Sequence, residues 1–260
     1  MRIVVKNSSE EAADFSAEFM VQSIRGQSDI TLGLATGSSP VRTYEKLIER
    51  HKNNDVSFKS VTTFNLDEYL GLTGDHPQSY RFFMNEKLFN HIDIDFSNTH
   101  IPNGSSPTPV QACNDYESLI QQKGGIDLQL LGIGRNGHIG FNEPTSSLTS
   151  RTRVKTLTKD TVEANQHNFT EEEYQPHLAM TMGIGTIMEA RQILLLATGE
   201  GKAQAIRDMV EGPLAAKCPA SMLQMHMNAT IVIDRDAAKL LEDVSFYEYI
   251  EQERQQLMSR

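Results

Sequence analysis

The chain has 260 residues, a formal net charge of −10 and two cysteines. This charge argues against nucleic acid as a main partner, because binding to a phosphate backbone depends on a clustered excess of lysine and arginine. The longest wholly apolar run is about five residues, whereas a membrane-spanning helix needs roughly twenty, so we expect no membrane partner. Because no secretory signal or zinc-type spacing is present, we expect a cytoplasmic protein with two free thiols.

Short β-rich runs alternate with helical patterns along the whole chain. Strands are predicted near residue 4 and at 30–35, 61–66, 126–133, 192–197 and 229–234, and helices at 8–25, 39–50, 79–92, 109–122 and 200–211. This alternation predicts an α/β fold with a mostly parallel sheet covered by helices. No repeat or linker divides the sequence, so a single domain over residues 1–260 is expected.

Two strand-to-helix turns resemble phosphate-binding turns. The first contains Gly37, Ser38 and Ser39 and is followed by Pro40, and the second leads to Lys202 in the first turn of the next predicted helix. A helix start presents unpaired N–H groups and a positive dipole end, which suit an anion. The alternative for the first turn is structural, with Ser39 as a helix cap. Lys202 is unfavourable at a helix start unless an anion lies nearby. Neither turn matches a nucleotide-binding motif.

Three residues that can transfer protons also follow predicted strands. Asp67 comes after the strand at 61–66, and His138 and Glu143 lie in GIGRNGHIGFNEP, after the strand at 126–133. Each residue alone is more often structural, as a turn-capping aspartate or a histidine bonded to a carbonyl. In open α/β sheets, however, ligands bind at the carboxyl ends of strands, where all these segments would meet. A carboxylate with a carboxylate-tuned histidine could transfer protons on a sugar phosphate.

The sequence resembles the glucosamine-6-phosphate deaminase family along nearly its whole length. The matching motifs are LATGSSP at 34–40, FNLDEYLGL at 64–72, HPQSY at 76–80, GIGRNGHIGFNEP at 132–144, SRTRVKTLT at 150–158 and LQMH at 223–226. The resemblance implies a Rossmann-like open sheet with helices on both faces. It also implies conversion of glucosamine 6-phosphate and water to fructose 6-phosphate and ammonia, in amino-sugar catabolism, without a metal or organic cofactor.

The resemblance further implies roles for particular residues. Asp67 matches the base that carries a proton from C2 to C1 of the opened sugar. His138 matches the residue that assists ring opening, with Glu143 and Asn136 around it. The residues that match the substrate phosphate site are Gly37, Ser38, Ser39, Lys202 and His167.

Three positions depart from the pattern of many members. Asn136 stands where an aspartate is common, so it can orient His138 but brings no charge. His167 stands where an arginine often contacts the phosphate. Because a neutral imidazole lacks the bidentate grip of a guanidinium, we expect weaker phosphate affinity or a compensating cation elsewhere. Ser38 replaces a glycine of some members and remains compatible with phosphate binding.

The basic segment at 151–159 is either a solvated strand face or a regulatory site. Alternation puts Arg151, Arg153 and Lys155 on one face. In some hexameric members, the region matching Ser146, Ser147, Arg153 and Lys155 binds the activator N-acetylglucosamine 6-phosphate between subunits. Other members are unregulated monomers, so the oligomeric state expected for this chain ranges from a monomer to a homo-hexamer.

Two other functions remain open at this stage. A 6-phosphogluconolactonase-like hydrolase would share the sheet and a related glycine-histidine motif, but it needs no base directed at C2, where Asp67 is expected. A sugar-phosphate sensor without turnover would bind the ligand and release no ammonia. The sequence does not distinguish glucosamine from its C4 epimer, galactosamine.

Overall fold

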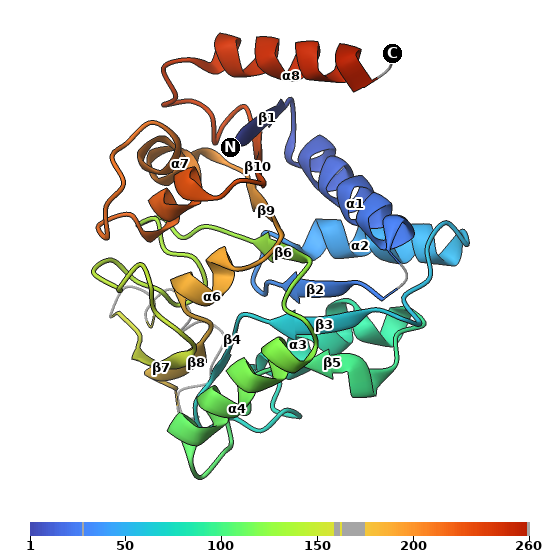
Figure 1. Ribbon diagram of the computed structural model, residues 1–260, viewed down its shortest axis with the longest axis vertical. Coiled ribbons are helices and arrows are strands. Elements are labelled where there is room, and N and C mark those ends of the chain that lie inside the picture. The colour runs from blue at the N-terminus through green and yellow to red at the C-terminus, as the bar shows by residue number, and fades with distance from the viewer. Residues whose placement is uncertain (28, 159–161, 163–174, 259–260) are drawn as a thin grey trace.

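The chain folds around a seven-stranded parallel sheet (Figure 1). The computed structural model describes all residues except 28, 159–161, 163–174 and 259–260. In spatial order the strands are β1 (Arg2–Lys6), β10 (Ala229–Asp234), β9 (Gln192–Ala197), β6 (Leu128–Leu131), β2 (Thr31–Leu34), β3 (Thr62–Asn65) and β5 (Thr99–His100). The predicted mostly parallel, Rossmann-like sheet is confirmed.

Helices cover both faces of this sheet, as predicted. The described helices are α1 (Ser9–Gly26), α2 (Val41–Lys52), α3 (Tyr80–Lys87), α4 (Pro109–Gln122), α6 (Ile184–Met188), α7 (Ala203–Val210) and α8 (Val244–Met258). One apolar core packs α1 and α2 against one face, and a second packs α4, α6 and α7 against the other. Figure 1 shows α1 and α2 to the right of the sheet and α6 and α7 to its left.

The order of the strands places a ligand-binding edge at the centre of the sheet. From β2 the chain continues outward through β3 and β5, then returns to the other side of β2 and continues through β6, β9 and β10. The reversal lies between β2 and β6, where Gly33 pairs with Gln129. Open α/β sheets bind ligands at such a reversal, beyond the carboxyl ends of the strands.

A second, three-stranded antiparallel sheet lies beside the main one. Its strands, in the order β4 (Asp67–Tyr69), β8 (Leu178–Thr181) and β7 (Arg153–Thr156), come from distant parts of the chain. Backbone hydrogen bonds join the two sheets, since Met182 N–H donates to the Leu66 carbonyl, which follows β3. Asp67 therefore lies at the junction of the two sheets.

Several local predictions need correction. The helix after the first turn begins at Val41, with Pro40 as its N-cap and no side-chain capping bond, so Ser39 does not cap it. Asp67 is not a turn residue but begins β4. The predicted helix at 200–211 is a 3-10 turn, η3 (Glu200–Lys202), followed by α7. Within the described part of the chain, no helix is long and apolar enough to span a membrane.

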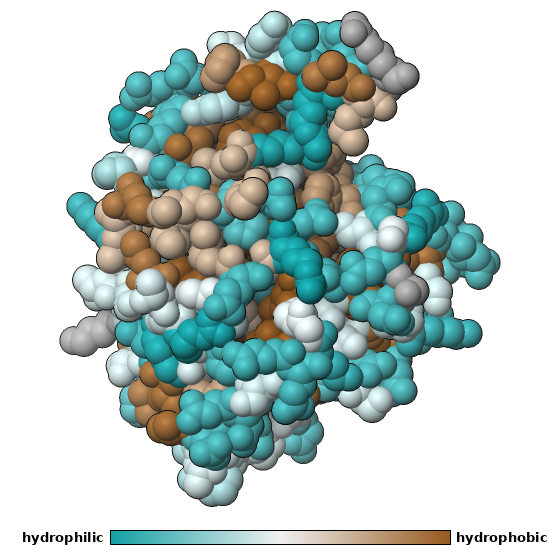
Figure 2. All heavy atoms as spheres, in the orientation of Figure 1, coloured by the Kyte–Doolittle hydropathy of each residue, from teal (hydrophilic) through white to brown (hydrophobic). Residues whose placement is uncertain are grey.

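The last helix, α8, was not predicted from the sequence. Its ion pair between Arg2 and Glu251 holds it beside β1, and Glu251 is its buried residue. Figure 2 shows apolar side chains gathered at the top of the molecule, where α8 lies, and the exposed ones include Phe246, Ile250 and Leu257. Phe246 and Ile250 are four residues apart, so they lie on one face of α8.

Candidate active site

The two predicted anion-binding turns adopt backbone conformations that only glycine accepts easily. Gly37 has a φ of 90° and Gly199 a φ of 87°. The Asp234 carboxylate fixes the second turn by accepting from Gly199 N–H, at 3.0 Å to each oxygen. In the first turn, the hydroxyls of Ser38 and Ser39 make no hydrogen bond to another described residue, which leaves them available to a ligand.

Lys202 turns its side chain back toward the loop after β6. Its Nζ donates a 2.6 Å hydrogen bond to the Ile133 carbonyl, and burial, followed by the charge of Arg135, lowers the pKa of the amino group. The Lys202 ammonium is thus half-buried and near a second cation. Ser39 approaches the same loop from the other side, since a Cβ at Gly132 would lie 3.8 Å from its hydroxyl.

Asp67 is a buried carboxyl group without a stabilising partner in the described residues. It is 5 % exposed, pairs across β4 and β8 with Thr181, and has Oδ2 close to Gly140. Burial, and secondarily the charge of Glu68, raises the pKa of Asp67 to about 8. A carboxyl with such a pKa can exchange protons near neutral pH, which suits a general base.

The neighbouring Glu68 connects two elements through backbone hydrogen bonds. Its carboxylate accepts backbone hydrogen bonds from Tyr69, Tyr80 and Arg81, at 2.8, 3.0 and 3.1 Å, and so ties β4 to the start of α3. The phenols of Tyr69 and Tyr80 lie 3.3 Å apart beside Asp67. Two adjacent acids therefore have different surroundings: Glu68 is bonded to backbone N–H groups, and Asp67 is free to react.

His138, Glu143 and Asn136 form a compact group in the loop after β6. The Nδ1 atom of His138 lies 3.3 Å from Glu143 Oε2, which also accepts a 2.7 Å bond from Asn136 Nδ2. The Asn136 side-chain oxygen accepts from His138 N–H at 3.2 Å. Although close to Glu143, Nδ1 makes no aligned hydrogen bond with a described residue. Such contacts are often loose before substrate binds.

Glycines allow this loop to fold tightly. A Cβ on Gly134 would overlap the His138 imidazole, and a Cβ on Gly137, whose φ is 80°, would overlap the Cys218 sulfur. Cys218 and Cys113 are both free and buried, as expected. Gly134 therefore allows the close packing of the histidine ring, and Gly137 allows the loop to approach Cys218.

The candidate regulatory residues have different environments. Arg153 pairs across β7 and β8 with Thr181, and its Nη1 donates a 2.8 Å bond to Asn142 Oδ1, next to Glu143. Ser146 is buried, and its hydroxyl lacks a hydrogen bond to a described residue. Ser147 is exposed and Lys155 is partly exposed. Because Arg153 contacts the loop of Glu143, the basic strand is more than a solvated face.

The structure brings most of the predicted site residues to one edge. Residues 37–39, 67, 136–143 and 202 follow β2, β3, β6 and β9, which are adjacent strands. His167 lies outside the described residues. Arg135 also lies at this edge, and no sequence signal marks it, because only the folded position of the β9 turn puts it beside Lys202.

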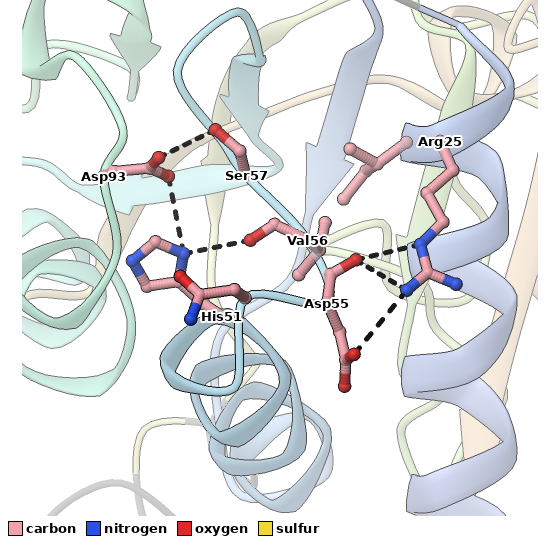
Figure 3. Close-up of a pocket in the computed structure, with 8 residues that line it drawn as sticks. Arg25, His51, Asp55, Val56, Ser57 and Asp93 are labelled. Atoms are coloured by element: carbon pink, nitrogen blue, oxygen red, sulfur yellow. Dashed lines mark hydrogen bonds and ion pairs between the residues drawn. The ribbon is translucent and has the colours of Figure 1, made fainter.

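A separate polar cavity lies at the opposite end of the strands. It has a volume of about 270 Å³ and includes the end of α2 and the loop leading to β3. Figure 3 shows polar side chains of this cavity facing one another: His51 lies 3.6 Å from Asp93, and Arg25 lies 3.9 Å from Asp55. These pairs join the loops at the amino ends of the strands, so the cavity is not part of the candidate site. Across the described residues, no group of three His, Cys, Asp or Glu side chains could hold a metal ion.

Known proteins share both the sequence and the fold. The sequence profile described as glucosamine-6-phosphate isomerases/6-phosphogluconolactonase matches residues 5–232. Proteins named glucosamine-6-phosphate deaminase from Shewanella woodyi and Cellvibrio japonicus are 61 % and 57 % identical over 260 residues, covering 100 % of this chain and 98 % and 99 % of theirs.

Solved structures agree. A monomeric glucosamine-6-phosphate deaminase superposes with a TM-score of 0.90 at 45 % identity, over 92 % of this chain and 100 % of that one. A 6-phosphogluconolactonase from Trypanosoma cruzi superposes with a TM-score of 0.75 at 19 % identity, over 93 % of this chain and 97 % of that one, which indicates a shared fold alone. The chain therefore belongs to the glucosamine-6-phosphate isomerase/6-phosphogluconolactonase family of enzymes.

Proposed function

We propose that this enzyme converts glucosamine 6-phosphate and water to fructose 6-phosphate and ammonia. The observation that carries the proposal is the buried Asp67, whose raised pKa suits a base that takes a proton from carbon and returns it. The high identity to deaminases over the full chain supports the same activity. A lactonase would have no use for such a base. We keep the cytoplasm as the expected location, since both thiols are free.

Ring opening is assigned to His138. The imidazole takes the proton of the anomeric hydroxyl and delivers it to the ring oxygen, which gives the open-chain aldehyde. Glu143, 3.3 Å from Nδ1, stabilises the protonated ring, and Asn136 holds Glu143 in place. A carboxylate beside a histidine raises its basicity and fixes its orientation.

Isomerisation is assigned to Asp67. Its carboxylate removes the C2 proton while the ammonium group at C2 gives one proton to the C1 oxygen, which forms a neutral enolamine. The Asp67 carboxyl then returns its proton to C1, which leaves an iminium at C2. Water adds to the iminium carbon, the C–N bond breaks, and ammonia leaves with fructose 6-phosphate. Each proton transfer contributes about 10² to 10⁴ in rate, so positioning of the sugar must supply much of the remainder.

The phosphate is assigned to the two glycine turns. Gly37, Ser38 and Ser39 offer N–H and hydroxyl donors from one side, and Lys202 offers an ammonium from the other. His167 is kept as a further candidate. This end of the substrate would fix the distance of C2 from Asp67.

The test is an incubation with glucosamine 6-phosphate in which ammonia and fructose 6-phosphate are measured together. Equal release of both, at least about 10²-fold slower in Asp67→Asn, is the expected result. Asp75→Asn, an exposed aspartate outside the site, is the matched control and keeps full activity. The galactosamine epimer is assayed in parallel to define specificity.

The other outcomes point to different functions. Binding of the sugar phosphate without either product would identify a sensor, and hydrolysis of 6-phosphogluconolactone in place of deamination would identify a lactonase. Sedimentation of the same preparation determines whether the enzyme is a monomer, as its solved relative is, or an oligomer.

A further inference from the structure

Two cations, Lys202 and Arg135, meet at the carboxyl ends of β6 and β9, and neither has a carboxylate partner among the described residues. Lys202 ends the turn after β9, and Arg135 lies in the loop after β6. No ion pair joins either side chain to a described acid, although the chain has ten more acidic than basic residues. In so acidic a protein, two neighbouring cations without acids indicate a place for an anion.

The geometry brings these cations to the second glycine turn. The Nζ of Lys202 is anchored 2.6 Å from the carbonyl of Ile133, two residues before Arg135. A Cβ at Gly201 would lie 3.8 Å from Nε of Arg135, so the guanidinium passes directly over the turn. The charges of Arg135 and Lys202 repel each other, which adds to the lowering of the Lys202 pKa, and a bound dianion would offset the repulsion.

We propose that Arg135 binds the substrate phosphate together with Lys202. It is the cation that compensates for the histidine standing in place of an arginine at position 167. This inference rests on the proposed sugar-phosphate substrate. Arg135 is exposed, and its guanidinium forms no hydrogen bond or ion pair with the described part of the chain, so it can turn toward an anion. Its planar fork supplies the bidentate contact to phosphate oxygens that neither an ammonium nor a neutral imidazole can make.

The proposal is tested by the kinetics of Arg135→Gln and Arg135→Lys. Loss of a charge-assisted bidentate contact is expected to raise KM for glucosamine 6-phosphate about ten- to a hundred-fold, with kcat nearly unchanged. The lysine variant, which keeps the charge without the fork, should fall between. Inorganic phosphate should inhibit the wild type competitively and the glutamine variant much less. Raising the salt concentration should raise KM more in the wild type than in the variant.

Arg207→Gln is the matched control. Arg207 is a cation on α7 that pairs with Glu242 at 3.1 Å, away from the turn, and its loss should leave KM and phosphate inhibition unchanged. Wild-type KM and phosphate inhibition in Arg135→Gln would overturn the proposal.

Titration calorimetry with glucosamine 6-phosphate separates this proposal from the proposed activity. Binding without turnover in the wild type, weakened in Arg135→Gln, would refute the deaminase function and support the role of Arg135. Turnover by the wild type, with the same KM in Arg135→Gln, would support the deaminase function and refute the role of Arg135. A wild type that binds no sugar phosphate would refute both.

Discussion

Replacing Asp67 by asparagine should stabilise the protein, and the gain should increase with pH. Asp67 has a pKa of about 8 in the folded protein, against 3.8 when solvated. A raised carboxyl pKa contributes stability that is present below pH 3.8 and is lost as pH rises toward 8, because ionisation is then easier in the unfolded chain. Asparagine keeps the shape of the protonated acid and does not ionise.

The size of the effect follows from the two pKa values. Each pH unit between them costs the folded wild type about 1.4 kcal/mol, so the free energy of unfolding of Asp67→Asn relative to wild type should rise by about 3 to 4 kcal/mol from pH 5 to pH 8. Above pH 8 the difference should level off. Because the prediction concerns how the difference in free energy of unfolding changes with pH, any pH-independent effect of the new amide cancels.

Urea unfolding of both proteins across this pH range measures the difference. Asp75→Asn is the control: Asp75 is exposed and its pKa is lowered, chiefly by a hydrogen bond with Thr73, so it stays ionised from pH 5 to 8 and its replacement should give a flat difference. A flat curve for Asp67→Asn as well would refute the reasoning, because the carboxyl would then be solvated or paired.

Three further predictions concern the surroundings of the site. Glu68→Gln removes a charge that raises the pKa of Asp67, so the rise of kcat/KM with pH should move to lower pH, whereas an unmoved profile would contradict the electrostatic coupling. Asn136→Asp would place a second carboxyl about 3 Å from that of Glu143, and the two would share a proton. The melting temperature of this variant should therefore be lower than that of the wild type, with a larger drop at pH 8 than at pH 5. Equal melting curves would show that the loop relaxes. If Arg153 transmits regulation through Asn142, N-acetylglucosamine 6-phosphate should lower the KM of the wild type and leave that of Arg153→Gln unchanged. Hyperbolic wild-type rate curves that this sugar phosphate does not change would refute the regulatory hypothesis.

The arrangement of the site could be predicted because parallel strands bring their carboxyl ends to one edge. The strands at 30–35, 61–66, 126–133 and 192–197 are each apparent from the sequence, so the residues that follow them are expected at the same edge of the sheet. The order of the strands was not available from the sequence. It depends on long-range pairing, such as Leu34 with Asn65, which no local pattern encodes.

Other features were missed for definite reasons. The strands β4 and β5 have three and two residues, too few to show alternation. The hydrogen bond from Lys202 to the Ile133 carbonyl spans 69 residues, so the sequence suggested only an unexplained cation at a helix start. No local pattern marks Arg135, because its position beside the turn after β9 arises only when the chain folds. Non-local contacts, rather than poor local patterns, account for these gaps.

The small second sheet explains how the carboxyl of Asp67 can be buried at the end of a strand. A buried strand end leaves N–H and C=O groups that must find partners, and β4 obtains them from β8, where Asp67 pairs with Thr181 and Tyr69 with Ala179. With its backbone satisfied in this way, Asp67 stays buried, and burial of its carboxyl, followed by the charge of Glu68, raises its pKa. A loop in the same place would need water to satisfy its backbone, and that water would return the carboxyl to its ordinary acidity. The three-residue strand therefore keeps the Asp67 carboxyl buried, and this burial raises its pKa.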